Sequence, residues 1–496
     1  MKRALINTLL AALLLISCGK GIPDSSSETQ SLPSIFPDYT GITIPANIAP
    51  MNFRILEQGD RFLTVFTSGN VQVTVKGDIA ALKEKDWKRL KNSGNNIDVK
   101  VLTFKGGRWT AFKTFSMTLS DEIDPYISYR LIPPSVVSYE RLSINQRDLT
   151  SFREKVIYAN SMIQKGDNGQ CINCHHYRNW KTDNLQFHAR QYKGGTIMAV
   201  EGELRKVNLK TDSTISAGVY PAWHPTHDYI AYSTNKTHQS IHTADHNRIE
   251  VADEESDLIL YDIQANAVSI IENDSNRFEC FPAWTPDGRT LYYVSADYKV
   301  PFGPEREDRV FLDSRTIKYN LYRKPFNPDT RTWGKSELVI DAAAMDCSIT
   351  LPRISPDGSK LLFSMGEYGV FHIWHKDADL YIMDIADGKI RPLTEVNSDN
   401  VESYHSWSSN GKWIIFSTRR EDGAYTRLYL SHLNKDGSFS KPFTIPQRNP
   451  DFNRNFMFSF NIPEFMKEPV SISPRKFASF IKREAQSVTY QSKKEE

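Results

Sequence analysis

Short runs of alternating hydrophobic and polar residues, separated by glycine, proline and asparagine, make up most of this 496-residue chain. Four such runs fall between residues 62 and 115, and the last two flank the Gly-Gly pair at 106–107. Alternation with a period of two is typical of half-buried β-strands, and two glycines between strands favour a tight hairpin. Residues 78–90 instead place apolar side chains on one helical face, with Asp78 as the expected N-cap. Residues 48–125 are therefore predicted to form a small β-rich domain with one helix.

A second pattern repeats four times after residue 213. In each copy an apolar residue and a proline or histidine precede an anchoring residue and a tight turn, and the anchoring residues are Trp223, Trp284, Ile354 and Trp407. Proline fixes one backbone angle, Asp-Gly or Asn-Gly supplies the positive φ of the turn, and an aromatic-rich strand returns. A second pair of strands follows in each copy. A four-stranded unit repeated in this way is typical of a β-propeller.

These copies resemble the TolB-type propeller repeat, whose blades carry P-x-W-S-P-D-G before an aromatic strand. The resemblance covers residues 213–448, although the copy at Tyr220 has Thr226-His227-Asp228 in place of Asp-Gly. It implies an all-β, TolB-like β-propeller of about six blades. The whole chain is also similar to lipoproteins of Bacteroidetes-type bacteria that join this propeller to a C-x-x-C-H motif. That likeness implies architecture and cellular address more than activity.

The segments on either side of the repeats complete the expected organisation. The predicted divisions are 126–212 as an irregular first blade with the C-x-x-C-H motif inserted in it, 213–470 as propeller repeats, and 471–496 as a C-terminal helix and tail. Residues 150–163 are predicted as a helix, and residues 449–470 are expected to return a strand to the ring. Ser473 is the expected N-cap of the last helix, which should run to Val488.

The stretch Cys171-Ile172-Asn173-Cys174-His175 is the attachment signature of c-type haem. Two thiols at this spacing add to the two vinyl groups of one porphyrin, and the imidazole that follows reaches the iron. The same side chains also allow a disulfide, a zinc site completed by His175, His176 or His188, or a thioredoxin-like redox pair, whose strand-to-helix context is missing here. One covalent haem c is the favoured prediction, with zinc or no cofactor as the alternatives.

A haem at this position has a sixth coordination site on the iron. Met198 and His188 are the candidate sixth ligands, and an open or water-filled position is the alternative. Arg178, Lys181 and Arg190 are candidates for pairing with the haem propionates, and a solvated basic face is the alternative for them.

The N-terminal pattern predicts an address outside the cytoplasm. Two basic residues precede an apolar run that is too short to span a bilayer permanently, and Ser17-Cys18 ends it as a bacterial lipobox. Residues 1–18 are predicted to be a lipoprotein signal peptide ending at a lipidated Cys18, and residues 19–47 a flexible tether. A plain secretory signal is the alternative. The expected location is the bacterial cell envelope, at the outer membrane on its periplasmic or surface face, where c-type haem is attached.

Two further groups of residues leave alternatives open. Cys280 and Cys347 stand in similar repeat positions and are either buried thiols or a disulfide between neighbouring blades. Histidines and one aspartate in the expected blade loops form either a ligand or metal pocket on one face or solvated loops. They are His238, His242, Asp245, His246, His372, His375 and His405.

Composition narrows the range of functions. The formal net charge is +2, with both signs well mixed, so no nucleic-acid partner is expected. No G-x-S-x-G elbow or hydrolase domain follows the repeats, which argues against a propeller peptidase. An electron carrier or binding protein is favoured over an enzyme, and the sequence does not decide between them. We expect a membrane-anchored c-type haem protein that transfers electrons and docks a redox partner such as another c-type cytochrome. The alternative is a non-catalytic propeller scaffold or ligand-binding lipoprotein, with a structural metal or relic C-x-x-C-H site.

Overall fold

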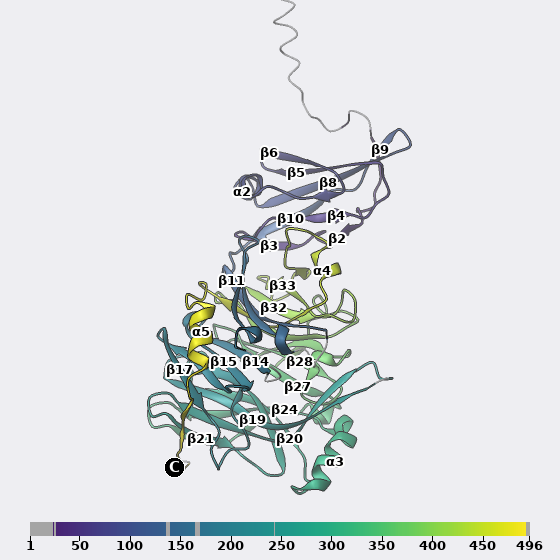
Figure 1. Ribbon diagram of the computed structural model, residues 1–496. Coiled ribbons are helices and arrows are strands. Elements are labelled where there is room, and N and C mark those ends of the chain that lie inside the picture. Colours follow the sequence, from purple (N-terminus) through teal and green to yellow (C-terminus); the bar gives the residue numbers. More distant parts are fainter. Residues whose placement is uncertain (1–22, 24–25, 135–138, 164–168, 243, 493–496) are drawn as a thin grey trace, which may run out of the picture. The chain divides into compact units, whose positions relative to one another are not determined.

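The computed structural model describes residues 23, 26–134, 139–163, 169–242 and 244–492, which form two compact units (Figure 1). Of the described residues, unit 1 contains those up to 42 together with 50–119 and 448–451, and unit 2 contains 43–49, those within 120–447 and those from 452 to 492. Cys18 and the predicted signal peptide lie outside the described residues. Among the described residues, no helix has the length and apolar character that a membrane crossing requires.

Unit 1 is built on an antiparallel sheet, as the alternating pattern predicts. Its main strands are β5 (Arg61–Ser68), β6 (Val71–Lys76), β8 (Asn96–Lys105), β9 (Arg108–Ala111) and β10 (Phe115–Ser120). Lys105 pairs with Arg108 across the predicted hairpin, and Gly106 and Gly107 have φ values of 57° and 80°. Because both turn residues need a positive φ, the two glycines fix this hairpin.

Two expectations for this region are wrong. The helix α2 is Glu84–Lys91, not 78–90, because Ile79–Ala80 instead form a short strand, β7, paired with β4 (Phe53–Ile55). Residues 26–47, expected to be part of a flexible tether, are folded. Tyr39 is fully buried, and β1 (Ser27–Glu28) pairs in parallel with β9. The burial of apolar side chains in this segment stabilises its fold, although the average composition of the segment is typical of a flexible tether.

Unit 2 contains five sheets whose strands follow one another in the chain. They are β14–β17 (Gln170–Arg178, Lys181–Gln191, Gly195–Val200, Glu203–Asn208), β18–β21 (Val219–Trp223, Tyr229–Ile241, Ile249–Asp262, Ala267–Glu272), β22–β26 (Arg277–Trp284, Thr290–Asp297, Asn320–Asn327, Thr332–Trp333, Glu337–Ile340), β27–β30 (Ser348–Ile354, Lys360–Gly366, Asp379–Asp384, Ile390–Pro392) and β31–β34 (Glu402–Trp407, Trp413–Thr418, Arg427–His432, Phe443–Thr444). The helix α3 (Pro304–Leu312) interrupts the third sheet. Neighbouring sheets share hydrophobic cores; Ala231 and Leu258, for example, pack in one cluster with Trp284 and Leu291.

A sixth sheet joins the two ends of this region. Its order is β13 (Glu154–Ala159), β12 (Ser143–Asp148), β11 (Tyr126–Ile132) and β35 (Ser459–Met466). The expected strand from residues 449–470 is thus confirmed. The helix predicted at 150–163 is wrong, because its β-branched and aromatic residues form β13 against the open edge of β12. Residues 126–212 accordingly contribute to two sheets instead of one irregular blade.

The first strands of the five sheets and β35 form the innermost layer. In the order β35, β14, β18, β22, β27 and β31, each innermost strand contacts the next, and β31 contacts β35. The contacts therefore close on themselves, as expected for strands that surround one axis.

Every innermost strand carries a bulge at the same point. The bulge residue has a positive φ in each case, between 44° and 57°, and a proline or histidine follows it. The six bulge residues are Cys174, Tyr220, Phe281, Leu351, Tyr404 and Ile462. A positive φ is uncommon for residues with a Cβ, so a sixfold recurrence indicates that the fold imposes it.

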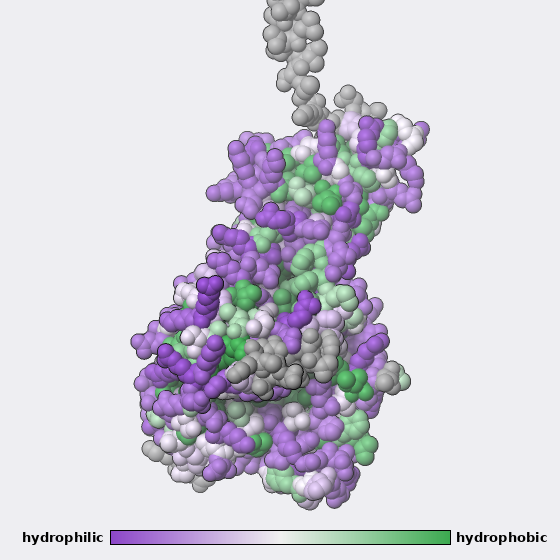
Figure 2. Space-filling view, viewed as in Figure 1, coloured by the Kyte–Doolittle hydropathy of each residue, from purple (hydrophilic) through white to green (hydrophobic). Residues whose placement is uncertain are grey.

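The C-terminal tail differs in part from its prediction. The helix α5 (Pro474–Ile481) begins where expected, and Ser473 caps it by accepting a hydrogen bond from the Lys476 amide. It ends well before Val488, because β36 (Gln486–Ser487) and β37 (Thr489–Tyr490) add parallel edge strands to two neighbouring sheets. Both units show mainly hydrophilic side chains on the face drawn in Figure 2, with isolated hydrophobic ones between them.

Candidate functional site

The C-x-x-C-H motif lies in the innermost strand β14, not in an insertion. Its residues pair with β15 up to Asn173, and pairing resumes at His176 after the bulge. Cys174, with a φ of 57°, and His175 thus occupy one of the six equivalent bulges. The motif is therefore part of a repeated strand, and no inserted segment is needed to place it in the sheet.

The six bulge residues, which we call the axial ring, gather around the middle of the space inside the innermost strands. All of them line one small cavity of about 40 Å³. A volume of that size accommodates one water molecule and no larger ligand. Cys174 therefore faces a nearly filled centre, together with the side chains of Tyr220 and Tyr404.

His175 is the most unusual member of the motif. It is 2% exposed, and neither ring nitrogen makes a hydrogen bond of good geometry to a described residue, although the backbones of Ser128 and Ile462 lie near enough to oppose the lowering of its pKa. Burial, assisted by the positive charge of Arg130, lowers the pKa of His175 to about 3, so the imidazole is neutral. A neutral imidazole with a free nitrogen is the form that ligates a metal, whereas a buried histidine without partners is otherwise costly.

Both motif thiols are free. Cys171 is half-buried, and Cys174 is buried, which raises the pKa of its thiol above the ordinary value. Cys280 and Cys347 are free as well, which settles their alternative in favour of thiols. Burial raises the thiol pKa at both of these positions, so neither is an activated nucleophile.

The chemistry of the motif fits haem attachment. Its two free thiols are three residues apart along β14, and a neutral imidazole follows the second thiol directly. The small cavity at the axial ring does not hold a porphyrin. A second cavity of about 510 Å³ does have the volume of a cofactor site. Arg130 lines it and reaches the motif, since its Nη1 donates to the Ile172 carbonyl at 3.4 Å.

The two candidate sixth ligands lie in different surroundings. Met198, on β16, is completely buried in a hydrophobic cluster that contains no residue of the motif. Met198 pairs with Gln186 of β15, which in turn pairs with His176, so strand β15 lies between Met198 and the motif. His188, on β15, lies directly opposite Asn173, and its Nδ1 shares a hydrogen bond of 3.2 Å with the Thr196 hydroxyl. Burial lowers the pKa of His188 to about 3.

The residues expected near the propionates are also separated. Arg178 forms an ion pair of 2.9 Å with Asp228 and so has a partner already. Lys181 is exposed at the end of the β14–β15 hairpin, and Arg190 is exposed opposite Cys171. Of the three, only Arg190 lies next to a motif cysteine.

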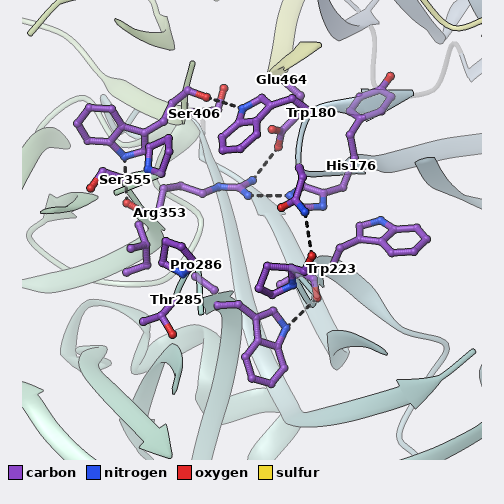
Figure 3. A pocket seen from close by; sticks show the side chains of 18 of the residues that line it. His176, Trp180, Trp223, Thr285, Pro286, Arg353, Ser355, Ser406 and Glu464 are labelled. Carbon is purple, nitrogen blue, oxygen red and sulfur yellow. Dashed lines mark hydrogen bonds and ion pairs between the residues drawn. The ribbon is translucent and has the colours of Figure 1, made fainter. Parts of the chain in front are cut away.

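A third cavity, of about 370 Å³, lies beyond the axial ring on the side of His176, and we call it the Arg353 cavity (Figure 3). Arg353, from β27, donates to His176 Nε2 at 3.1 Å and to Glu464 Oε1 at 2.9 Å. Burial raises the pKa of Glu464 although Arg353 opposes the shift. Burial also lowers the pKa of His176, and Arg353 adds to that shift, so this histidine is neutral.

Tryptophans from several strands wall the Arg353 cavity. Their indole nitrogens are mostly paired with backbone carbonyls: Trp284 donates to Ala222, Trp407 to Arg353 and Trp180 to Trp407. Trp223 is the exception, because its buried Nε1 has no partner among the described residues. The cavity thus offers aromatic walls and one unused donor to a ligand.

The histidines predicted in the blade loops do not form a metal centre. His372, His375 and His405 are buried, not solvated, and His375 Nε2 lies 2.9 Å from Glu250 Oε2. In the part of the chain that the structure describes, no three His, Cys, Asp or Glu side chains converge as a metal site requires. Burial explains the lowered pKa of His372 and of His405, each to about 3.

Comparison with known proteins gives the fold and little more. No protein-family model matches the chain, and no curated protein matches it. Among solved structures, TolB from Acinetobacter baumannii is similar over 77% of this chain and 85% of that chain, with a TM-score of 0.41 and 14% identity. A mutant apocarotenoid oxygenase from Synechocystis covers 86% of this chain and 95% of its own, with a TM-score of 0.38 and 11% identity. An oligogalacturonate lyase in complex with manganese covers 82% and 99%, with a TM-score of 0.32 and 12% identity.

At these scores the likeness reflects only the general path of the chain. The class of the protein follows from the strand order and the closed contacts of the innermost strands, which define a mostly β protein of the β-propeller type. Sequence reasoning found four copies of the repeat but missed those at Cys174 and Ile462. A search for a proline or histidine two residues before an aromatic, without the Asp-Gly turn, finds both.

Proposed function

We propose that this protein is an extracytoplasmic c-type haem protein anchored by a lipid on Cys18, with its six sheets as the blades of a closed, TolB-like propeller. Cys171 and Cys174 would hold the porphyrin and His175 would ligate the iron. The observation that carries this proposal is the neutral, buried His175, whose ring nitrogens make no hydrogen bond of good geometry to the described residues, one residue after a free thiol. An unpaired, neutral imidazole in a buried position is expected if it coordinates the iron of a bound haem.

The residues of the chain have separate tasks in this proposal. The bulge at Cys174 fixes the backbone of the motif, so its donors are positioned by the same device that shapes the other five blades. Burial keeps His175 uncharged at neutral pH. A bound haem supplies reversible one-electron chemistry, and the outer faces of the blades supply a docking surface for a redox partner such as another c-type cytochrome.

A direct test uses full-length protein made in a bacterium competent for cytochrome c maturation. We expect a pyridine haemochrome spectrum and a mass gain of one haem, both lost in Cys171→Ser. Cys347→Ser is the matched control, since that thiol is also free and half-buried but lies outside the motif. A colourless wild-type protein, or colour retained in Cys171→Ser, would contradict the proposal.

The lipid anchor has its own test. We expect Cys18→Ser to move the protein from the membrane fraction to the soluble fraction without changing its haem content. Retention of the variant in the membrane would contradict lipidation at this cysteine.

A second function rests on a different observation, the equivalence of the six bulges. Cys174 and His175 occupy the positions of Tyr404 and His405, which belong to no haem motif. On this reading the motif is a structural part of one blade, and the protein is a ligand-binding lipoprotein. The unused indole donor of Trp223 in the Arg353 cavity favours a ligand there. A colourless protein that still folds would support this second function.

A further inference from the structure

The cavity of about 510 Å³ lies beside the innermost strands on the opposite side of the axial ring from the Arg353 cavity, and we call it the Arg419 cavity. The order of residues along β35 shows this placement: Ser459 and Asn461 line the Arg419 cavity, Ile462 belongs to the axial ring, and Glu464 lines the Arg353 cavity. The two cavities thus lie at opposite ends of one strand.

The Arg419 cavity is rich in positive charge. Four of the residues that line it are cations, namely Arg130, Arg248, Lys376 and Arg419. The only acidic residue in the lining is Asp422, whose Oδ1 accepts hydrogen bonds of 2.8 Å from the amides of Ala424 and Tyr425. Its other oxygen lies 3.8 Å from Arg427, outside this group of cations.

Arg419 itself is the strongest sign that a partner is missing. The residue is 4% exposed, its Nε has no hydrogen-bond partner, and no described carboxylate forms an ion pair with it. Its guanidinium lies flat against Trp374, 3.4 Å from the ring centroid. Burial lowers the pKa of Arg419, and the negative charge of Asp422 opposes this shift only in part, as expected for a cation that has lost water without gaining a directly paired anion.

Other buried arginines of this chain show how such a group is normally satisfied. Arg427 donates to the carbonyls of Asn453, Phe456 and Phe458 at 2.7–2.8 Å. Arg306 likewise donates to three carbonyls at 2.8–3.0 Å. Each of these two arginines leaves one buried nitrogen unpaired, Nε in Arg427 and Nη2 in Arg306, but Arg419 has no equivalent set of carbonyl partners, although it is buried to a similar degree. Its unused donors therefore point to a ligand and not to the protein itself.

The walls of the cavity indicate what the rest of that ligand is like. Phe371, Ile373, Trp374 and Pro133 supply aromatic and aliphatic surface beside the cations. A site of this volume with a few polar groups in an apolar lining is typical of small organic ligands and cofactors. An arginine fork is suited to a carboxylate, which it can bind through two parallel hydrogen bonds.

We propose that the Arg419 cavity binds a flat, largely apolar organic acid, whose carboxylate pairs with Arg419 while its body packs against Trp374. Two sources have this chemistry. One is the propionate edge of a haem held at Cys171 and Cys174, and this source rests on the proposed function; the bond from Arg130 to Ile172 links cavity and motif. The other is a free aromatic acid, which would bind whether or not the motif carries haem.

The test uses the full chain with Cys171→Ser and Cys174→Ser, so that no covalent attachment occurs. The probes are protoporphyrin IX, its dimethyl ester and 1-pyrenebutyrate, titrated by absorbance and fluorescence. We expect an acid to bind at least about tenfold more tightly than the ester and to lose about tenfold or more in Arg419→Gln, since a charge-assisted bond is removed. Arg475→Gln, at an exposed arginine of α5, should leave the affinity unchanged.

The outcomes separate the two sources and the two proposals. Binding of protoporphyrin IX that depends on Arg419 supports the haem source, and binding of 1-pyrenebutyrate alone supports a free acid. Equal binding of acid and ester, or an affinity unaffected by Arg419→Gln, overturns the inference. If Arg419→Gln does not fold, the salt dependence of the unsubstituted cavity decides: at about 0.5 M salt, acid binding should weaken and ester binding should not. If the haemochrome test of the mature protein is negative, a haem propionate is excluded as the ligand, and the proposal of a site for a free aromatic acid is unaffected.

Discussion

The two cavities at the ends of β35 contain similar side chains in opposite states. In the Arg353 cavity, the arginine is held between Glu464 and the neutral His176, and its charge is compensated within the protein. In the Arg419 cavity, the arginine is more deeply buried and forms no ion pair with a described carboxylate. The difference teaches that burial alone does not mark a binding site. A buried charged group whose hydrogen bonds are made within the protein has a structural role. A buried charged group without such partners indicates a missing ligand.

The largest expected effect comes from removing the ion pair between Arg353 and Glu464. Arg353→Met should lower the free energy of unfolding of unit 2 by about 2–3 kcal/mol at pH 7, because it leaves the buried carboxylate of Glu464 without its cation. Urea unfolding followed by tryptophan fluorescence measures it. The double variant Arg353→Met/Glu464→Met should recover most of the loss, and a failure to recover would show that Arg353 acts through packing.

The next effect has the opposite sign. Arg419→Met should raise the free energy of unfolding by about 1–2 kcal/mol in the ligand-free protein, because it replaces an uncompensated buried cation by an apolar side chain of similar length. The same urea experiment applies, with Arg475→Met as the surface control. A marked loss of stability would mean that Arg419 has a structural partner after all.

The pH dependence of the first variant sharpens the contrast. The folded-state pKa of Glu464 is raised above its ordinary value of 4.5, so its favourable contribution is complete below that value and is lost as the pH rises through the folded-state pKa. Removing Arg353 raises this pKa further. The deficit of Arg353→Met should therefore shrink by about 1 kcal/mol or more between pH 7 and pH 4, whereas the gain of Arg419→Met should change little over that range.

The smallest effect concerns the indole donors of the Arg353 cavity. Trp284→Phe removes a hydrogen bond of 3.1 Å to the Ala222 carbonyl, whereas Trp223→Phe removes none among the described residues. Both changes delete the same atoms, so the difference between their unfolding free energies isolates the bond, at about 1 kcal/mol. Equal losses would show that Trp223 Nε1 is satisfied by water.

Local signals predicted the elements of this protein better than its sites. Proline, glycine and the anchoring residues, three tryptophans and Ile354, mark four of the six innermost strands, because a tight turn and a bulge need particular residues at fixed positions. The bulge at Cys174 escaped notice because its residues also match a haem signature, and the helix expected at 150–163 failed because the open edge of β12 recruits it. Trp374 lies in the connection between β28 and β29, and Arg419 directly follows β32, so no spacing in the sequence predicts that the two side chains meet.

The position of β35 late in the chain has a consequence for folding during synthesis. The sheet that begins with residues 126–159 waits for β35, whose residues 459–466 emerge from the ribosome only after all the other blades. Until then the backbone edge of β11 is bare, and bare edges recruit strands from neighbouring chains. A nascent or truncated chain that stops before residue 459 should thus be prone to aggregate, however well its finished sheets are packed, and the synthesis of β35 ends this exposure.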